Sequence, residues 1–98
     1  MRMMLKFTIP VENGNAAIND GTLGSTAESI IGQLKPEAAY FGPIDGKRGG
    51  LIFFDLADPS EIAASVEPFF LSLNAAVELM PVMNADDLRK GLAKVQHK

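Results

Sequence analysis

The strongest structural signal in this chain is residues 49–56, GGLIFFDL, an apolar run that is opened by two glycines and followed by acidic residues. Side chains alternate between the two faces of a β-strand, so Leu51 and Phe53 share one face and Ile52 and Phe54 share the other. Both faces are apolar, which is typical of a strand that is covered on both sides of its sheet. The helices predicted elsewhere in the chain cover only one face. This mismatch predicts self-association.

The composition indicates one globular domain spanning residues 1–98, with 47% hydrophobic and 21% charged residues. The net charge is −3 and the basic residues are scattered, which argues against a nucleic-acid groove or an anionic membrane surface as partner. Without cysteine the chain has no disulfide, thiol nucleophile or cysteine-ligated zinc. Lys6 interrupts the apolar N-terminal segment, and no apolar run reaches membrane-spanning length. We therefore expect a soluble, cytoplasmic protein.

Side-chain periodicity and turn signals predict an alternating order of strands and helices. The four strands are expected at residues 3–10, 38–42, 51–56 and 76–83, with Asp45-Gly46 forming a hairpin turn between the second and the third. The helices are expected at residues 16–35 with a break near 19–24, at 58–73 with an end or bend at Pro68, and at 84–95.

Capping residues set the predicted helix starts. Asn13 is expected to cap the first helix, which restarts at Ser25 or Thr26 after the glycines that break it. Asp58, followed directly by proline, caps the second helix. Asn84 caps the last helix, whose acidic first turn and basic end follow the helix dipole. Asn74 is expected at the C-terminus of the second helix.

This order predicts an α+β fold, the ferredoxin-like βαββαβ arrangement with a further C-terminal helix. Right-handed crossovers place both long helices on one face of the sheet. The uncovered face is assigned, together with one face of strand 51–56, to Met4, Lys6, Thr8, Glu78, Met80 and Val82. Two copies stacked sheet to sheet would bury this face in a shared barrel-like core. The last helix also carries an apolar stripe, Leu88, Leu92 and Val95, that must pack on protein of the same chain or of another subunit.

Three segments carry a resemblance to a known superfamily: residues 35–41, KPEAAYF; residues 67–71, EPFFL; and residues 77–83, VELMPVM, which precede the helix start at 86–88. With them the chain resembles the dimeric α/β-barrel superfamily, which includes muconolactone isomerase and the cofactor-independent antibiotic-biosynthesis monooxygenases. It is more closely similar to a group of small uncharacterised bacterial proteins of that fold. The resemblance implies a ferredoxin-like homodimer. It implies no single activity, because members of the superfamily differ in chemistry.

Four side chains are candidate ligand-binding residues: Lys6, Tyr40, Glu67 and Glu78. Lys6 and Glu78 belong to neighbouring strands, where they form either a partly solvated ion pair or a pair that anchors a substrate. Tyr40 is interpreted as a structural, hydrogen-bonded phenol rather than a catalytic acid. Glu67 either projects into the space between helices and sheet or is a solvated carboxylate at a helix end.

Other residues point away from particular chemistries. His97 is the single histidine and lies beside the last residue, so no metal site and no histidine base are expected. Residues 46–50, GKRGG, lack the order of a phosphate-binding loop and are interpreted as a hairpin with an exposed Lys47-Arg48 pair. No cofactor is expected.

Two classes of function remain open. The first is a homodimer that holds a small apolar molecule between sheet and helices. The second is a cofactor-independent isomerase, decarboxylase or monooxygenase acting on a small hydrophobic or aromatic metabolite. The scarcity of histidine and the absence of cysteine and tryptophan favour the first class.

Overall fold

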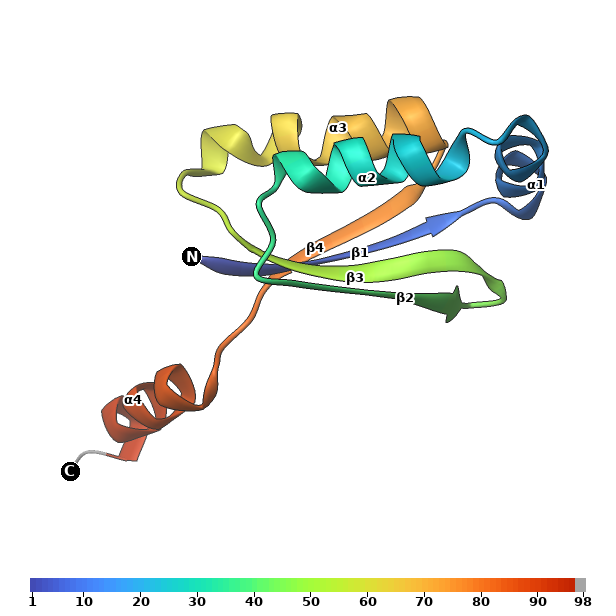
Figure 1. The fold of residues 1–98 in the computed structure, drawn as a ribbon. Helices are drawn as coiled ribbons and strands as arrows, with labels where there is room; N and C mark the ends of the chain where they lie inside the picture. Colours follow the sequence, from blue (N-terminus) through green and yellow to red (C-terminus); the bar gives the residue numbers. More distant parts are fainter. Residues whose placement is uncertain (97–98) are drawn as a thin grey trace.

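The structure, a computed structural model, describes residues 1–96; the prediction for His97 lies outside the described residues. Its elements follow one another as the sequence order predicts (Figure 1). They are β1 (Arg2–Ile9), α1 (Val11–Asp20), α2 (Leu23–Gln33), β2 (Ala38–Ile44), β3 (Lys47–Asp55), a 3₁₀ turn (Pro59–Glu61), α3 (Ile62–Leu73), β4 (Ala76–Pro81) and α4 (Ala85–Gln96).

The four strands form one antiparallel sheet in the order β2-β3-β1-β4, so the α+β class and the ferredoxin-like strand order are confirmed. The helices α2 and α3 run side by side over one face of this sheet (Figure 1). We call this the helical face and the opposite one the open face. Because β1 and β3 are the central strands, they carry most of the buried side chains.

The hydrophobic core lies between the helical face and the two helices. Leu5 and Ile52, opposite each other in β1 and β3, are fully buried, as is Phe69 from α3. Met3, Leu5, Phe7 and Ile9 of β1 are all buried on the helical face, which confirms the assignment of Met4, Lys6 and Thr8 to the other face. The centroids of the Phe69 and Phe7 rings lie 5.2 Å apart. This aromatic contact packs α3 against the central strand β1.

Several local predictions are confirmed. Asp45 and Gly46 form the hairpin turn with φ angles of 53° and 76°, the left-handed conformation that a tight two-residue turn requires. Asp58 accepts a hydrogen bond from the Ser60 backbone N–H at 3.0 Å, which caps the helical segment that follows. Asn74 ends α3 in the left-handed conformation. Asn84 caps α4 by accepting from the Asp87 N–H at 2.8 Å.

The predicted starts of α1 and α2 are wrong. α1 begins at Val11, directly after Pro10, so that Asn13 lies inside its first turn rather than at its cap. The Gly14 N–H already donates to the Pro10 carbonyl at 2.9 Å, and the fixed φ of proline suits this position before a helix. α2 begins at Leu23 instead of Ser25. The predicted break between the two helices is correct and falls at Gly21, with φ 73°.

The ends of two strands also differ from the prediction. β2 continues to Ile44 because it pairs with β3 up to the hairpin turn, and β4 ends at Pro81, although the Val82 N–H still donates to the Arg2 carbonyl at 3.1 Å. Of the two effects predicted for Pro68, an end of the helix is wrong, because Pro68 lies inside α3, which runs to Leu73 as the sequence predicts. The helix continues through this proline because Phe69 and Leu73 beyond it are buried against the sheet, which stabilises a helix with one missing backbone bond.

Candidate functional site

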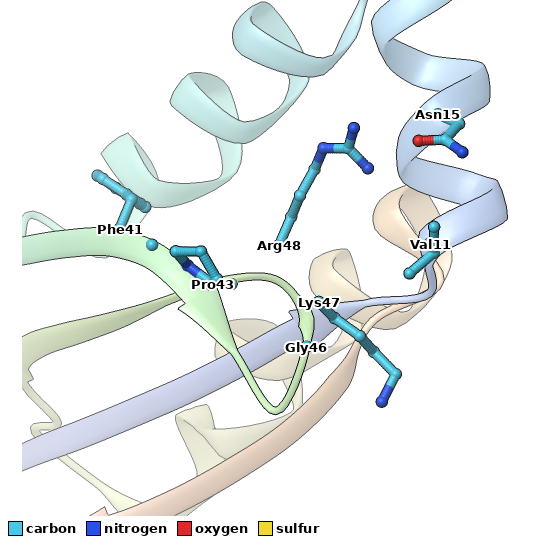
Figure 2. A pocket seen from close by; sticks show the side chains of 9 residues that line it. Val11, Asn15, Phe41, Pro43, Gly46, Lys47 and Arg48 are labelled. Carbon is cyan, nitrogen blue, oxygen red and sulfur yellow. The ribbon is translucent and has the colours of Figure 1, made fainter.

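A cleft of about 580 Å³ opens between the start of α1 and the β2–β3 hairpin. Figure 2 shows that α1 contributes Val11 and Asn15, and that β2 contributes Phe41 and Pro43. Arg48 of β3 extends from the hairpin into the space between these elements (Figure 2). The cleft therefore combines apolar walls with one amide and two cations, Arg48 and the exposed Lys47.

Arg48 reaches the cleft because of its place in the β3 alternation. It pairs with Ile9 of β1 and with Pro43 of β2, which puts its side chain on the helical face together with Ile52. The guanidinium passes directly over α1 at Gly14, where an added methyl group would come within 2.7 Å of Nη1. Gly14 thus leaves the room that the arginine side chain needs.

The Arg48 side chain is half-buried, yet its charge has no acidic partner among residues 1–96: every ion pair within that range involves other residues. A guanidinium offers several N–H donors in a planar fork that matches carboxylate, sulfonate and phosphate oxygens. An anionic group entering the cleft would therefore find a preorganised donor. Phe41 and Val11 beside it can contact an apolar body.

Three of the four predicted site residues lie elsewhere, in one row across the open face. Tyr40 pairs with Leu51, Leu51 with Lys6, and Lys6 with Glu78, so the row crosses all four strands. Lys6 Nζ lies 3.5 Å from Glu78 Oε2 and 3.3 Å from Asp45 Oδ2. The hydrogen bond to Asp45 and the charges of both carboxylates raise the pKa of Lys6 above its usual value.

The fourth predicted residue is far from this row. Glu67 is exposed near the middle of α3, on the opposite side of the sheet, so it is a solvated carboxylate but not one at a helix end. Tyr40 is 66% exposed, so its side chain is not the buried phenol that the sequence led us to expect. The structure therefore brings Lys6, Tyr40 and Glu78 onto one surface and leaves Glu67 apart.

Sequence reasoning missed the cleft. Lys47 and Arg48 were expected to be an exposed pair, but only Lys47 is exposed. The signal was present in the alternation of β3, because counting back from Ile52 in steps of two places Arg48 on the buried face. Nothing in the sequence indicated that Val11 and Asn15 would line the cleft, because the first helix was predicted to begin only at residue 16.

Comparison of the sequence with models of known protein families and with characterised proteins finds no match. No helix within residues 1–96 is long and apolar enough to cross a membrane.

Proposed function

We propose that this chain is a homodimeric binding protein for a small, largely apolar molecule that carries an anionic group, held in the cleft between α1 and the β2–β3 hairpin. The observation that carries this proposal is the half-buried Arg48 side chain, which faces an apolar cleft and has no carboxylate partner among residues 1–96.

The energetics of Arg48 favour an anionic ligand. Partial burial weakens the hydration of the Arg48 guanidinium, which costs free energy in the ligand-free protein. A ligand anion that accepts hydrogen bonds from the guanidinium offsets this cost. Two parallel N–H donors to one carboxylate give a short, charge-assisted contact with a defined orientation. The volume of the cleft falls within the range of small-molecule sites, and Phe41 supplies an aromatic surface for the apolar part.

The side chains of the cleft favour binding over catalysis. Its polar side chains are those of Asn15, Lys47 and Arg48. The residues that line the cleft include no carboxylate, histidine or hydroxyl side chain. A ligand held here would meet hydrogen-bond donors and positive charge, which orient an anion but do not shuttle a proton. The enzymatic alternative gains no support from this arrangement.

The homodimer is supported by the open face. Met4, Leu51 and Phe53 lie there half-buried beside the exposed Met80, and helices α2 and α3 lie on the opposite side. Two such faces stacked about 10 Å apart would cover these side chains and close the barrel-like core that the sequence predicts. Sedimentation equilibrium at micromolar concentration should then give about twice the chain mass of 10.5 kDa. A stable monomer would overturn this part of the proposal.

The ligand proposal is tested with 1-anilinonaphthalene-8-sulfonate, an aromatic sulfonate whose fluorescence rises in apolar sites. We expect saturable binding that phenylacetate displaces and the neutral phenylethanol does not. The variant Arg48→Met should weaken binding roughly tenfold or more, because it removes a charged hydrogen-bond donor. Lys35→Met is the matched control: it removes an exposed cation just after α2 that does not line the cleft, and it should leave the affinity nearly unchanged.

The thermal melting curve of Arg48→Met should stay close to that of the unchanged protein, which separates lost binding from lost folding. If Arg48→Met and the lysine control bound with equal affinity, Arg48 would not be the binding group. Displacement by phenylethanol as effective as by phenylacetate would show that no anion is recognised.

A further inference from the structure

The last helix stands away from the rest of the chain. Figure 1 shows α4 on the side of the open face, beyond the end of the sheet and joined to β4 by a short extended segment. Its apolar stripe is in solvent: Leu88 is 46% exposed, Leu92 44% and Val95 76%. An isolated helix of twelve residues is marginal in water, so this stripe needs a covering surface.

The chain is more extended than a compact monomer of the same length would be. Its accessible surface is 6532 Å², whereas a compact monomer of 10.5 kDa exposes about 5,400 Å². Its radius of gyration is 15.9 Å, against about 13 Å for a compact domain of this length. The excess surface, roughly 1,000 Å², is close to what each partner buries in a stable protein–protein interface.

An apolar groove of about 470 Å³ lies on the helical face between α2 and the edge strand β2. Its floor and walls are formed mainly by small or apolar residues: Gly24, Ala27, Ile31, Gly32, Ala39 and Phe41. Gly24 and Gly32 have open space where a side chain would be, which allows another helix to approach closely. Glu28 adds one carboxylate to the lining.

We infer that α4 docks in the α2–β2 groove of a second copy of this chain. This inference rests on the homodimer proposed above. The dimensions agree, because Leu88 to Val95 spans about 10 Å along a helix and Gly24 to Gly32 about 12 Å.

The attachment of α4 favours the groove of the second copy over its own. Arg2 of β1 lies 3.8 Å from Asp87, which ties the first turn of α4 to the start of the sheet. The linker of residues 82–84 spans at most about 11 Å. α4 leaves on the side of the open face, whereas its own groove lies on the helical face. The second sheet of the proposed dimer would lie on the side to which α4 already projects.

Two-fold symmetry would place the β4 edge of one copy beside the β2 edge of the other. β4 and β2 are the opposite edges of the sheet. When two such sheets stack about a two-fold axis parallel to the strands, β4 of each copy meets β2 of the other, and the same contact forms twice. α4, which follows β4, then passes the unpaired edge of β2 and reaches the groove beside it. Phe41 lines both this groove and the ligand cleft, so the docked helix would lie next to the ligand.

The test uses the natural absence of cysteine. One variant carries Leu92→Cys and a second, isotopically labelled variant carries Ala27→Cys. The two are unfolded together, refolded to mix their chains and then oxidised. We expect a disulfide between a labelled and an unlabelled chain, identified by mass. The control uses Lys90→Cys in place of Leu92→Cys: position 90 lies about 160° from position 92 around α4, so this variant should give little of the mixed disulfide.

Sedimentation of the unchanged protein separates this inference from the homodimer. Suppose the protein is a dimer, but Leu92→Cys forms no disulfide with Ala27→Cys, or forms no more of it than Lys90→Cys does. This result would overturn the docking of α4 and leave the stacked sheets in place. A monomer would overturn both. A disulfide within one chain of the double variant Ala27→Cys/Leu92→Cys would show that α4 covers its own groove and would also overturn the inference.

Discussion

Gly49 and Gly50 allow three strands to meet in the middle of the sheet. Both are buried, and each faces a different side. A methyl group at Gly50 would come within 2.8 Å of the rings of Phe7 and Phe41, so this glycine makes the space in which the two rings meet edge to face. A methyl group at Gly49 would collide with the backbone oxygen of Phe7. The glycine pair is therefore needed for packing rather than for a phosphate-binding loop.

Gly49→Ala should destabilise the fold by about 2–3 kcal/mol, since the obstacle is backbone of a central strand and the ladder must shift to relieve it. Gly42→Ala is the matched control: Gly42 pairs with Gly49 across the strands, and a methyl group there meets nothing within 4 Å. Urea unfolding should place the control within about 0.5 kcal/mol of the unchanged protein. Equal losses for both variants would contradict this account of Gly49.

At the scale of elements, α3 depends on its start. The Asp58 carboxylate accepts from the Ser60 backbone N–H and from the Ser60 hydroxyl, and these hydrogen bonds lower the pKa of Asp58. A carboxyl whose pKa is lower in the folded state stabilises the fold at pH values above its unfolded pKa. That contribution is lost as the pH falls through the lowered folded value.

Asp58→Ala should therefore lower the melting temperature at pH 7, and the difference from the unchanged protein should shrink towards pH 2. Asp58→Asn is the control, because asparagine caps a helix almost as well and does not titrate. Its melting temperature at pH 7 should lie close to that of the unchanged protein. A deficit of Asp58→Ala that is the same at both pH values would show that ionisation of Asp58 plays no part.

At the scale of the whole molecule, the proposed dimer combines the open face with the α4 contact. The row of Lys6 and Glu78 lies on this face, with Asp45 of the hairpin turn as a second partner of the lysine. Stacking a second sheet there removes water from these charges, and it leaves each charge with an opposite partner. The apolar residues around the row then supply the favourable part of the association.

Phe53→Lys should break the dimer, because it places a charge on the apolar part of the open face. Phe70→Lys changes a partly exposed phenylalanine of α3 instead and should leave the dimer intact. Sedimentation measures the mass of both variants. The melting temperature of the unchanged protein should rise with protein concentration, as mass action requires for a dimer, and that of Phe53→Lys should not. Dissociation by both variants alike would argue against the open face as the specific interface.

Local chemistry along the chain was enough to predict much of this fold. The turn at Asp45-Gly46, the caps at Asp58, Asn74 and Asn84, and the alternation in β1 follow from preferences that act over a few residues. The right-handed connection rule then places both long helices on one face of the sheet. Where two local signals competed, as at the start of α1, the sequence alone favoured the wrong one.

Contacts between distant segments decided the rest. Lys6 gained Asp45 as a partner only because the hairpin turn folds back beside β1. Arg48 faces a cleft only because Gly14 of α1 and Phe41 of β2 converge on it, and no periodicity within β3 specifies either neighbour. The apolar stripe of α4 could be read from residue spacing, but its position away from the sheet could not, because packing across the fold sets where a helix lies.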